Sequence, residues 1–507
     1  MSSRLGPAER RWVLAISSLT FLLRAVMGLR SEIILMTRPY IEDAYYALNC
    51  SWHISQGHGF SVDGIHPTNG VQPLITLLYA PFFFFTGDRL AGLRLTYILQ
   101  GLIVASGCYL LAEFVFMLRR SDRSRPYDAA PVIAAAVWGL AISCFNQNTN
   151  GLETGLTISL IIACFLNYEI LSRSRSLLRA FGFGVLLGLT VLARIDAAIL
   201  IVIIAIYDLA HNKWAALRSI LVYLGVALVI TAPWWIYNLA VFHNLMPTSG
   251  QLESLHRPYA ENFRFFGNAL FDYLTVFYYH FYRIWQGWVT VVATSTLLAL
   301  WILTFRLPRM RSWIRQQYDF RPLTPLLIFS VFLIVYYTLF FSAAHFLDRY
   351  LTPLRLIIVI LFSVGASAGT AIFRHRALRA CALAGAFAAI LFSALHYYGL
   401  FAHAAILEDF YWTGRWAAVQ QGSFGMMQTG LTGFIAPNVI NLDGKVNADA
   451  LEAQKKGNIA QYIIDTRIQY VADWADWVKP IIQTIRQRGV TYDSVRTIGS
   501  IVIYARR

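Results

Sequence analysis

Apolar segments of about twenty residues recur along roughly the first 400 positions of the chain. A helix of this length is long enough to cross the hydrocarbon core of a bilayer, and the pattern predicts about eleven such spans. The predicted spans are residues 12–30, 91–117, 129–145, 154–171, 180–194, 197–210, 217–237, 284–305, 323–342, 350–372 and 380–400. The chain is therefore predicted to be a polytopic α-helical membrane protein.

The apolar segment 72–86 is shorter than the others and contains Pro73 and Pro81. Arg10 and Arg11 precede the first span, which predicts a cytoplasmic N-terminus. All later arginine-rich loops can be cytoplasmic only if residues 72–86 do not cross the membrane, because a crossing would invert each of them. We therefore predict a re-entrant or interfacial helix at 72–86, within a long first external loop, 31–90, that carries amphipathic helices.

The last hundred residues have a different character. Strand-like segments at 439–446 and 468–474 alternate with helical patterns at 448–466 and 476–488, and a hairpin is predicted for 490–505. Such alternation is typical of a small α/β domain. We predict a transmembrane domain over residues 1–400 and a soluble extracytoplasmic domain over residues 401–507.

Composition and charge agree with a membrane protein. The 507 residues are 57% hydrophobic and 14% charged, against roughly 25% charged residues in soluble proteins. The net charge of +15 comes from short basic loops between apolar segments, which indicates membrane orientation and excludes a nucleic-acid partner. Five cysteines without a C-x-x-C pair predict neither a disulfide framework nor a zinc site.

The candidate chemistry begins with two adjacent carboxylates, Glu42 and Asp43, in the first external loop. Residues 44–56 follow as a predicted amphipathic helix, whose dipole favours the ionised form of acids at its start. An ionised carboxylate can act as a general base, although Asp43 could instead serve only as a helix N-cap. The irregular segment 57–73 after this helix is tolerated near a membrane where it lines a wet cavity, which favours an active site.

Several motifs in fixed order extend this pattern. They are Glu42-Asp43-Ala44-Tyr45-Tyr46, Gly57-His58-Gly59-Phe60, Asp63-Gly64-Ile65-His66-Pro67-Thr68-Asn69-Gly70, Gln72-Pro73-Leu74, Asn150-Gly151-Leu152-Glu153-Thr154, Leu192-Ala193-Arg194-Ile195-Asp196-Ala197, Pro233-Trp234, Tyr237-Asn238, Leu245-Met246-Pro247-Thr248-Ser249-Gly250, and Asp348-Arg349-Tyr350-Leu351 with Pro353. With this set the chain resembles the GT-C class of integral-membrane glycosyltransferases, in the bacterial branch that uses lipid-linked sugars. The resemblance covers most of the membrane part and, more loosely, the C-terminal domain.

The resemblance implies an enzyme of the bacterial cell membrane. It would take a sugar from a polyprenyl-phosphate donor within the lipid and transfer it, with inversion, to a hydroxyl of a glycan or glycolipid acceptor on the external face. A carboxylate of the first external loop would be the base. Relatives often carry Asp-Asp or Asp-Glu where this chain has Glu42 and Asp43, so the base stays open between the two, with Asp43 preferred.

Metal dependence is open as well. One carboxylate pair does not require a divalent metal, although some relatives carry one. The sequence does not identify the sugar or the acceptor.

Cations at the external ends of spans are candidates for binding the donor phosphate. These are Arg349, His345 and Arg194. Arg349 beside Asp348, and Arg194 beside Asp196, could instead form structural ion pairs.

Polar residues of the external loops are candidates for substrate binding. They are His66, Asn69, Tyr45, Tyr46 and Glu153. His66 could equally be a turn residue, and Glu153 could only mark the start of a helix.

Other functions fit the sequence less well. It contains no D-x-D, P-loop or G-x-G-x-x-G motif, which favours a lipid-linked donor over a nucleotide sugar. A lipid or glycan transporter, or a flippase, is the main alternative. Such a protein should show internal repeats and ionisable residues at the bilayer midplane. This sequence shows no such repeat, and its charged residues gather on one face of the membrane instead. A non-catalytic assembly or receptor protein would leave the acidic pair without a role.

Overall fold

The computed structural model describes residues 5–120, 128–255, 306–341, 347–371 and 405–507, with a few isolated residues between these ranges. The predicted spans 284–305 and 380–400 and the candidate residue His345 lie outside these ranges.

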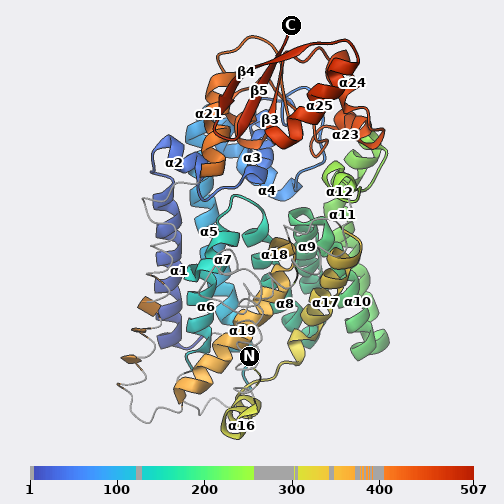
Figure 1. Ribbon diagram of the computed structural model, residues 1–507. Coiled ribbons are helices and arrows are strands. Elements are labelled where there is room, and N and C mark those ends of the chain that lie inside the picture. The colour runs from blue at the N-terminus through green and yellow to red at the C-terminus, as the bar shows by residue number, and fades with distance from the viewer. Residues whose placement is uncertain are drawn as a thin grey trace.

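Long helices form the membrane part of the protein, as predicted (Figure 1). They are α1 (Pro7–Met27), α5 (Arg89–Met117), α6 (Ala130–Leu140), α7 (Ile142–Asn148), α8 (Thr154–Ser174), α9 (Leu177–Ala193), α10 (Ala198–Asn212), α11 (Leu217–Phe242), α17 (Thr324–Leu339) and α19 (Thr352–Ala371). Within the described ranges, five helical segments are long and apolar enough to cross a membrane. The predicted span 129–145 is divided into α6 and α7, because the chain is extended at Ala141 (φ −63°, ψ 136°).

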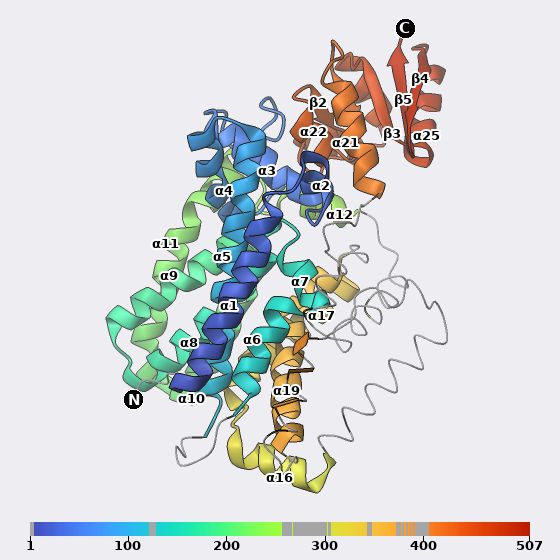
Figure 2. The same ribbon diagram turned by 90° about the vertical axis from the view of Figure 1, so that its left-hand side faces the viewer.

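Three shorter helices form the first loop. They are α2 (Glu32–Thr37), α3 (Glu42–Ser55) and α4 (Pro73–Thr86), and they lie at the end of the helical bundle that adjoins the C-terminal residues (Figures 1 and 2). Helix α4 has 14 residues and is therefore about 21 Å long, shorter than the ~30 Å hydrocarbon core. Its exposed Phe84 and Phe85 suit the interfacial position that the sequence predicts.

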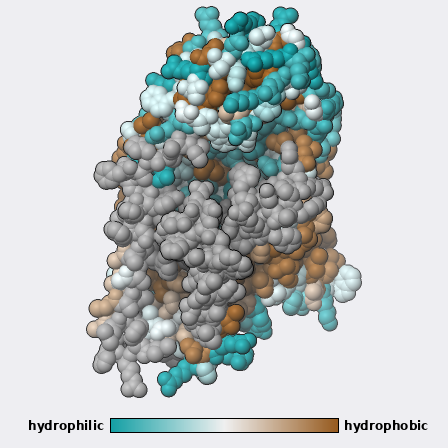
Figure 3. All heavy atoms as spheres, viewed as in Figure 1, coloured by the Kyte–Doolittle hydropathy of each residue, from teal (hydrophilic) through white to brown (hydrophobic). Residues whose placement is uncertain are grey.

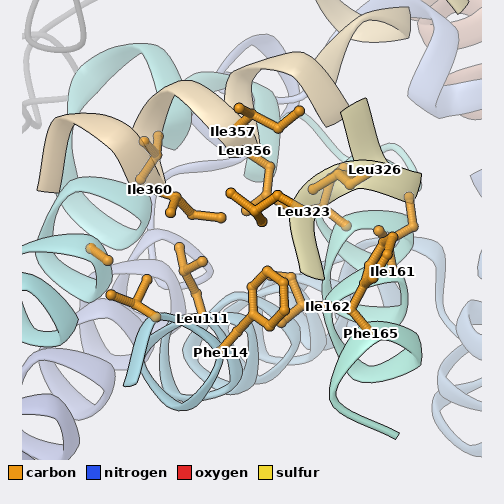
Figure 4. Close-up of a cluster of buried hydrophobic side chains, with 14 of the residues drawn as sticks. Leu111, Phe114, Ile161, Ile162, Phe165, Leu323, Leu326, Leu356, Ile357 and Ile360 are labelled. Atoms are coloured by element: carbon orange, nitrogen blue, oxygen red, sulfur yellow. The ribbon is translucent and has the colours of Figure 1, made fainter. Parts of the chain in front are cut away.

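The membrane helices are held together by close packing of apolar side chains. Figure 4 shows part of this core, where α5, α8, α19 and the start of α17 meet. The labelled residues are Leu111, Phe114, Ile161, Ile162, Phe165, Leu323, Leu326, Leu356, Ile357 and Ile360. Because lipid tails are as apolar as these side chains, van der Waals contact rather than escape from water stabilises the bundle.

Residues 405–507, the C-terminal region, begin with α21 (Ala405–Ala417) and contain a five-stranded sheet. Its strands are β1 (Phe424–Met426), β2 (Val439–Asn441), β3 (Tyr470–Trp474), β4 (Tyr492–Ile498) and β5 (Ile501–Arg506), in the order β2-β1-β3-β5-β4. Strands β2, β1 and β3 are parallel, with Phe424 opposite Val439 and Tyr470, and β5 is antiparallel to β3 and β4. The helices are α22 (Gly430–Ile435), α23 (Ala448–Lys455), α24 (Ile459–Asp465) and α25 (Ala475–Gln487).

The predicted hairpin is therefore present as β4 and β5, and the predicted helix 448–466 is divided into α23 and α24. Hydrophilic residues gather over the C-terminal region and at the opposite end of the molecule, and hydrophobic residues predominate on the coloured part of the flank between them (Figure 3). The N-terminus and the C-terminal region lie at opposite ends of the bundle (Figure 1). A short helix, α12 (Thr248–Glu253), joins the end of α11 to the underside of this region.

Candidate functional site

A cavity of about 780 Å³ lies between the helical bundle and the C-terminal region. Its walls come from α3, the loop before α4, the segment before α8, the segment between α9 and α10, helices α11, α12 and α17, the residues just before α19, and one turn of the C-terminal region. The charged residues that line it are Asp43, Glu153, Arg194, Asp196, Glu253, Arg349 and Lys445. The rest of the wall is largely apolar and includes Leu228, Phe332 and Tyr336.

Asp43 lies in the first turn of α3, with its side chain 14% exposed. Its Oδ2 is 3.5 Å from Arg349 Nη1, and its Oδ1 is 3.5 Å from Lys445 Nζ. The N-cap of α3 is Ile41, and no side chain caps this helix. The alternative that Asp43 serves only as an N-cap is therefore wrong: its carboxylate faces two cations inside the cavity.

Glu42 points away from the cavity. Both its carboxylate oxygens accept the Leu431 backbone N–H of α22, at 3.1 and 3.2 Å. Burial raises the pKa of Glu42 to about 8, although the Leu431 amide lowers it and Asp43 raises it further. At Gly430 a side chain would clash with the backbone carbonyl of Glu42, so glycine permits this close contact. Glu42 thus joins α3 to the C-terminal region.

Arg349 lies in the short helix α18 (Leu347–Tyr350). Its guanidinium contacts the neighbouring Tyr350, with Nη2 donating to the hydroxyl at 3.2 Å and the ring centroid 5.0 Å away. The carboxylate it contacts, Asp43, is 306 residues earlier in the chain. Arg349 is therefore a well-anchored cation on one side of Asp43.

Arg194 belongs to a second charged group in the same cavity. Its guanidinium is 2.9 Å from Glu153 Oε1 and 2.6 Å from Asp196 Oδ2. The Tyr337 hydroxyl of α17 also donates to Asp196, at 2.6 Å. The predicted structural pair with Asp196 is therefore present. Glu153 occupies the N-cap position of α8, but its side chain makes no cap hydrogen bond and pairs with Arg194 instead.

The remaining candidates divide between the cavity and its surroundings. Tyr46 lines the cavity. Tyr45 is buried beneath the C-terminal region, where its hydroxyl donates to the Met36 carbonyl at 2.6 Å and its ring packs on Phe434. Tyr45 therefore supports the position of α3 and does not reach the cavity.

His66 and Asn69 lie in the loop before α4 and are not lining residues. The ring Nδ1 of His66 is 2.6 Å from Asp63 Oδ2, and this hydrogen bond raises the pKa of His66. Asn69 is fully buried and accepts the Thr248 backbone N–H at 2.9 Å. In this structure both residues stabilise the loop, and a role in substrate binding stays a prediction.

Sequence reasoning missed two charged residues of the cavity, Glu253 and Lys445. Glu253 ends α12, and its Oε1 is 3.8 Å from Lys445 Nζ. Lys445 follows the turn residues Asn441, Asp443 and Gly444, and its neighbours indicated only turn chemistry. Nothing in the sequence signals that this lysine contacts a carboxylate 402 residues earlier.

Within the described ranges, no group of three or more His, Cys, Asp or Glu side chains is arranged to hold a metal ion. Asp43 and Glu253 both face the Lys445 ammonium. A positive charge from the chain itself therefore lies between these two carboxylates.

No protein-family model matches the chain, and no curated protein matches it significantly in sequence. Among solved structures, ArnT from Cupriavidus metallidurans bound to undecaprenyl phosphate has a TM-score of 0.55 and 14% sequence identity, over 97% of both chains. The same protein in the apo state has a TM-score of 0.52 and 14% identity, over 98% of both chains. An oligosaccharyltransferase from Archaeoglobus fulgidus, in a complex with zinc and sulfate, is 12% identical in sequence. The match spans 96% of this chain and 73% of the archaeal chain, with a TM-score of only 0.47.

ArnT is a GT-C glycosyltransferase. The chain therefore has the GT-C fold, as its motifs predicted.

Proposed function

We propose that this protein is an inverting glycosyltransferase. It moves a sugar from a polyprenyl-phosphate donor to an acceptor hydroxyl at the external surface of the membrane. The position of Asp43 carries this proposal: a carboxylate at a helix start, inside a large cavity, between two cations. The fold shared with ArnT, which was solved with undecaprenyl phosphate, supports the donor class.

Asp43 is the base in this proposal. Its carboxylate takes the proton of the acceptor hydroxyl, and the oxygen forms a bond to the anomeric carbon of the sugar. The bond from that carbon to the phosphate oxygen breaks, and its electron pair leaves with the polyprenyl phosphate. Attack opposite the leaving group inverts the anomeric configuration. Glu42, the other candidate, is turned towards Leu431 and outside the cavity.

Arg349 receives the negative charge that develops on the departing phosphate. A guanidinium suits this task because its planar set of N–H donors matches phosphate oxygens. Tyr350 fixes the guanidinium beside Asp43, within reach of a phosphate on the far side of the anomeric carbon from the acceptor hydroxyl. Arg194 already contacts two carboxylates, and phosphate binding by this residue stays a prediction.

The apolar part of the cavity wall would hold the first isoprene units of the donor. Leu228 lies on α11, and Phe332 and Tyr336 lie on α17, two helices of the membrane bundle. A lipid chain entering between them would bring its phosphate to the charged end of the cavity.

The proposed orientation is that of a bacterial cell-membrane protein with a cytoplasmic N-terminus and an external C-terminal region. The two lie at opposite ends of the bundle (Figure 1), and Arg10 and Arg11 lie at the N-terminal end. The cavity adjoins the C-terminal region, so the reaction would take place on the external side.

The test is a transfer assay in detergent with a panel of polyprenyl-phosphate sugars and a membrane extract as acceptor. Asp43→Asn removes the base but keeps the size of the side chain, and we expect the transfer rate to fall about 10²- to 10⁴-fold. The matched control is Asp465→Asn, because Asp465 is exposed at the end of α24. Normal turnover by Asp43→Asn would refute Asp43 as the base, and normal turnover by both Asp43→Asn and Glu42→Gln would refute the proposed function.

A further inference from the structure

Lys445 brings a positive charge from the C-terminal region into the cavity. It lies between β2 and α23, and its side chain is 12% exposed. The ammonium is 3.5 Å from Asp43 Oδ1 and 3.8 Å from Glu253 Oε1. These partners belong to two separate segments of the membrane part, so Lys445 connects three distant parts of the chain.

The backbone at Lys445 is held in place by contacts of its own. Its carbonyl accepts the Thr248 hydroxyl of α12 at 2.8 Å, and its N–H donates to Asp443 Oδ1 at 2.7 Å. At Gly70 a side chain would clash with the same carbonyl. The first loop, α12 and the C-terminal turn therefore meet at this one peptide, which places the ammonium in the cavity.

The ammonium remains charged in this setting. Burial alone would lower the pKa of Lys445, but Asp43, Asp443 and Glu253 raise it above its ordinary value. A buried charge is costly unless it is paired. The surrounding carboxylates supply this pairing and keep the ammonium protonated.

The two oxygens of Asp43 each face a cation, with Oδ1 next to Lys445 and Oδ2 next to Arg349. A cation beside a carboxylate weakens it as a base, so the departure of one cation would make Asp43 a stronger base towards the acceptor hydroxyl. Arg349 is fixed by its hydrogen bond and ring contact with Tyr350. Lys445 carries its charge at the end of a flexible four-carbon chain, so its ammonium can turn while its backbone stays in place.

We propose that Lys445 is a further catalytic residue, which exchanges its contact with Asp43 for one with the donor phosphate. This inference rests on the proposed function. When the donor binds, the ammonium turns to a phosphate oxygen, and Oδ1 of Asp43 becomes available to the acceptor hydroxyl. Lys445 and Arg349 then share the negative charge of the departing phosphate, and Glu253 keeps the ammonium within reach.

The C-terminal region is thereby part of the active site. The donor thereby activates the base, because the two cations weaken Asp43 as a proton acceptor until a phosphate draws one of them away. A site of this kind avoids proton transfer before a donor is present.

The experiment measures two quantities on full-length protein, the affinity for undecaprenyl phosphate and the rate of sugar transfer. Lys445→Met removes the charge and keeps the chain length, Lys445→Gln keeps a hydrogen-bond donor, and Lys445→Arg keeps the charge. We expect about ten- to hundredfold weaker binding of undecaprenyl phosphate by the Met and Gln variants, with a loss of transfer of at least that size and partial rescue by Arg. Lys456→Ala is the control, since Lys456 is exposed just after α23.

Thermal unfolding shows which variants are folded, and only folded variants are compared with wild type. Unchanged binding and transfer in folded Lys445→Gln or Lys445→Met would overturn the role of Lys445 while leaving the glycosyltransferase proposal intact. If wild-type protein transfers no sugar from any donor, the proposed function fails. In that case a tenfold loss of undecaprenyl-phosphate affinity still supports the cation site, and unchanged affinity overturns it too.

Discussion

Replacement of Glu42 by glutamine should change how the stability of the protein depends on pH. The pKa of Glu42 is raised from 4.5 to about 8, chiefly by burial. The folded protein therefore holds a proton at this site over a pH range in which the unfolded chain has released it. Stability falls as pH rises wherever the folded state binds more protons, so wild-type protein should lose stability between about pH 4.5 and pH 8.

The magnitude follows from the two pKa values. One unit of difference corresponds to about 1.4 kcal/mol, so Glu42 lowers the free energy of unfolding by about 3 kcal/mol at pH 7 and about 5 kcal/mol above pH 8. Glutamine has the shape of the neutral acid, and its side-chain oxygen can accept the Leu431 N–H. It carries no charge at any of these pH values. Glu42→Gln should therefore match wild type near pH 4.5 and become the more stable protein as pH rises.

The assay is thermal unfolding of the two proteins in one detergent, scanned at fixed rate from pH 4.5 to pH 9. The difference in Tm between wild type and Glu42→Gln reports on Glu42 and on its electrostatic coupling to Asp43 and Asp473, because the other acids titrate in both proteins. Glu452→Gln, at an exposed residue of α23, is the matched control for the loss of a carboxylate at the surface. If the Glu42→Gln curve runs parallel to wild type over the whole range, Glu42 is not a buried neutral acid and the reasoning fails.

Two further substitutions test neighbouring contacts. Arg349→Gln removes the anchored cation beside Asp43 and should weaken undecaprenyl-phosphate binding about ten- to hundredfold, whereas an affinity equal to wild type would exclude Arg349 from the phosphate site. Gly430→Ala introduces a methyl group against the Glu42 carbonyl and should lower the Tm. Gly225→Ala is the control and should leave the Tm unlowered, because no atom lies within 4 Å of the added carbon. Equal Tm values for the two variants would show that α22 can shift without cost.

Much of the membrane architecture could be predicted because apolar length is a local property of the sequence. The end points of α5, α8 and α11 lie close to those expected from hydropathy. The break at Ala141 could not be predicted, because the surrounding residues are uniformly apolar or small. The short strand β1 was missed because its three residues, Phe-Gly-Met, carry no alternating pattern.

Only part of the candidate site could be predicted from the sequence. The adjacent acids Glu42 and Asp43 marked a segment that borders the cavity, but the sequence could not separate their positions. Neighbouring residues on a helix point about 100° apart, so one side chain enters the cavity and the other turns to α22. Which direction is which depends on the packing of the C-terminal region against α3.

The ion pairs of Asp43 could not be predicted from the sequence either, because they join residues that are far apart along the chain. Asp43 contacts cations 306 and 402 residues away, and no local pattern encodes such distances. The resemblance to GT-C enzymes pointed to Arg349 but not to Lys445. Polar residues such as Tyr45 and Asn69 looked like binding residues, yet in the structure their hydrogen bonds go to the backbone of neighbouring segments.

The peptide at which Gly70, Thr248 and Lys445 meet has a consequence for how the protein matures. Synthesis begins at the N-terminus, and early segments fold before later ones, so α3 and α12 are made long before the turn that carries Lys445. Until that turn docks, Asp43 lacks one of its two cations, and nothing fills the space against Gly70. Under the proposed mechanism, a chain whose C-terminal region has not docked would lack the ammonium beside Asp43, so the docking of this region would complete the active site.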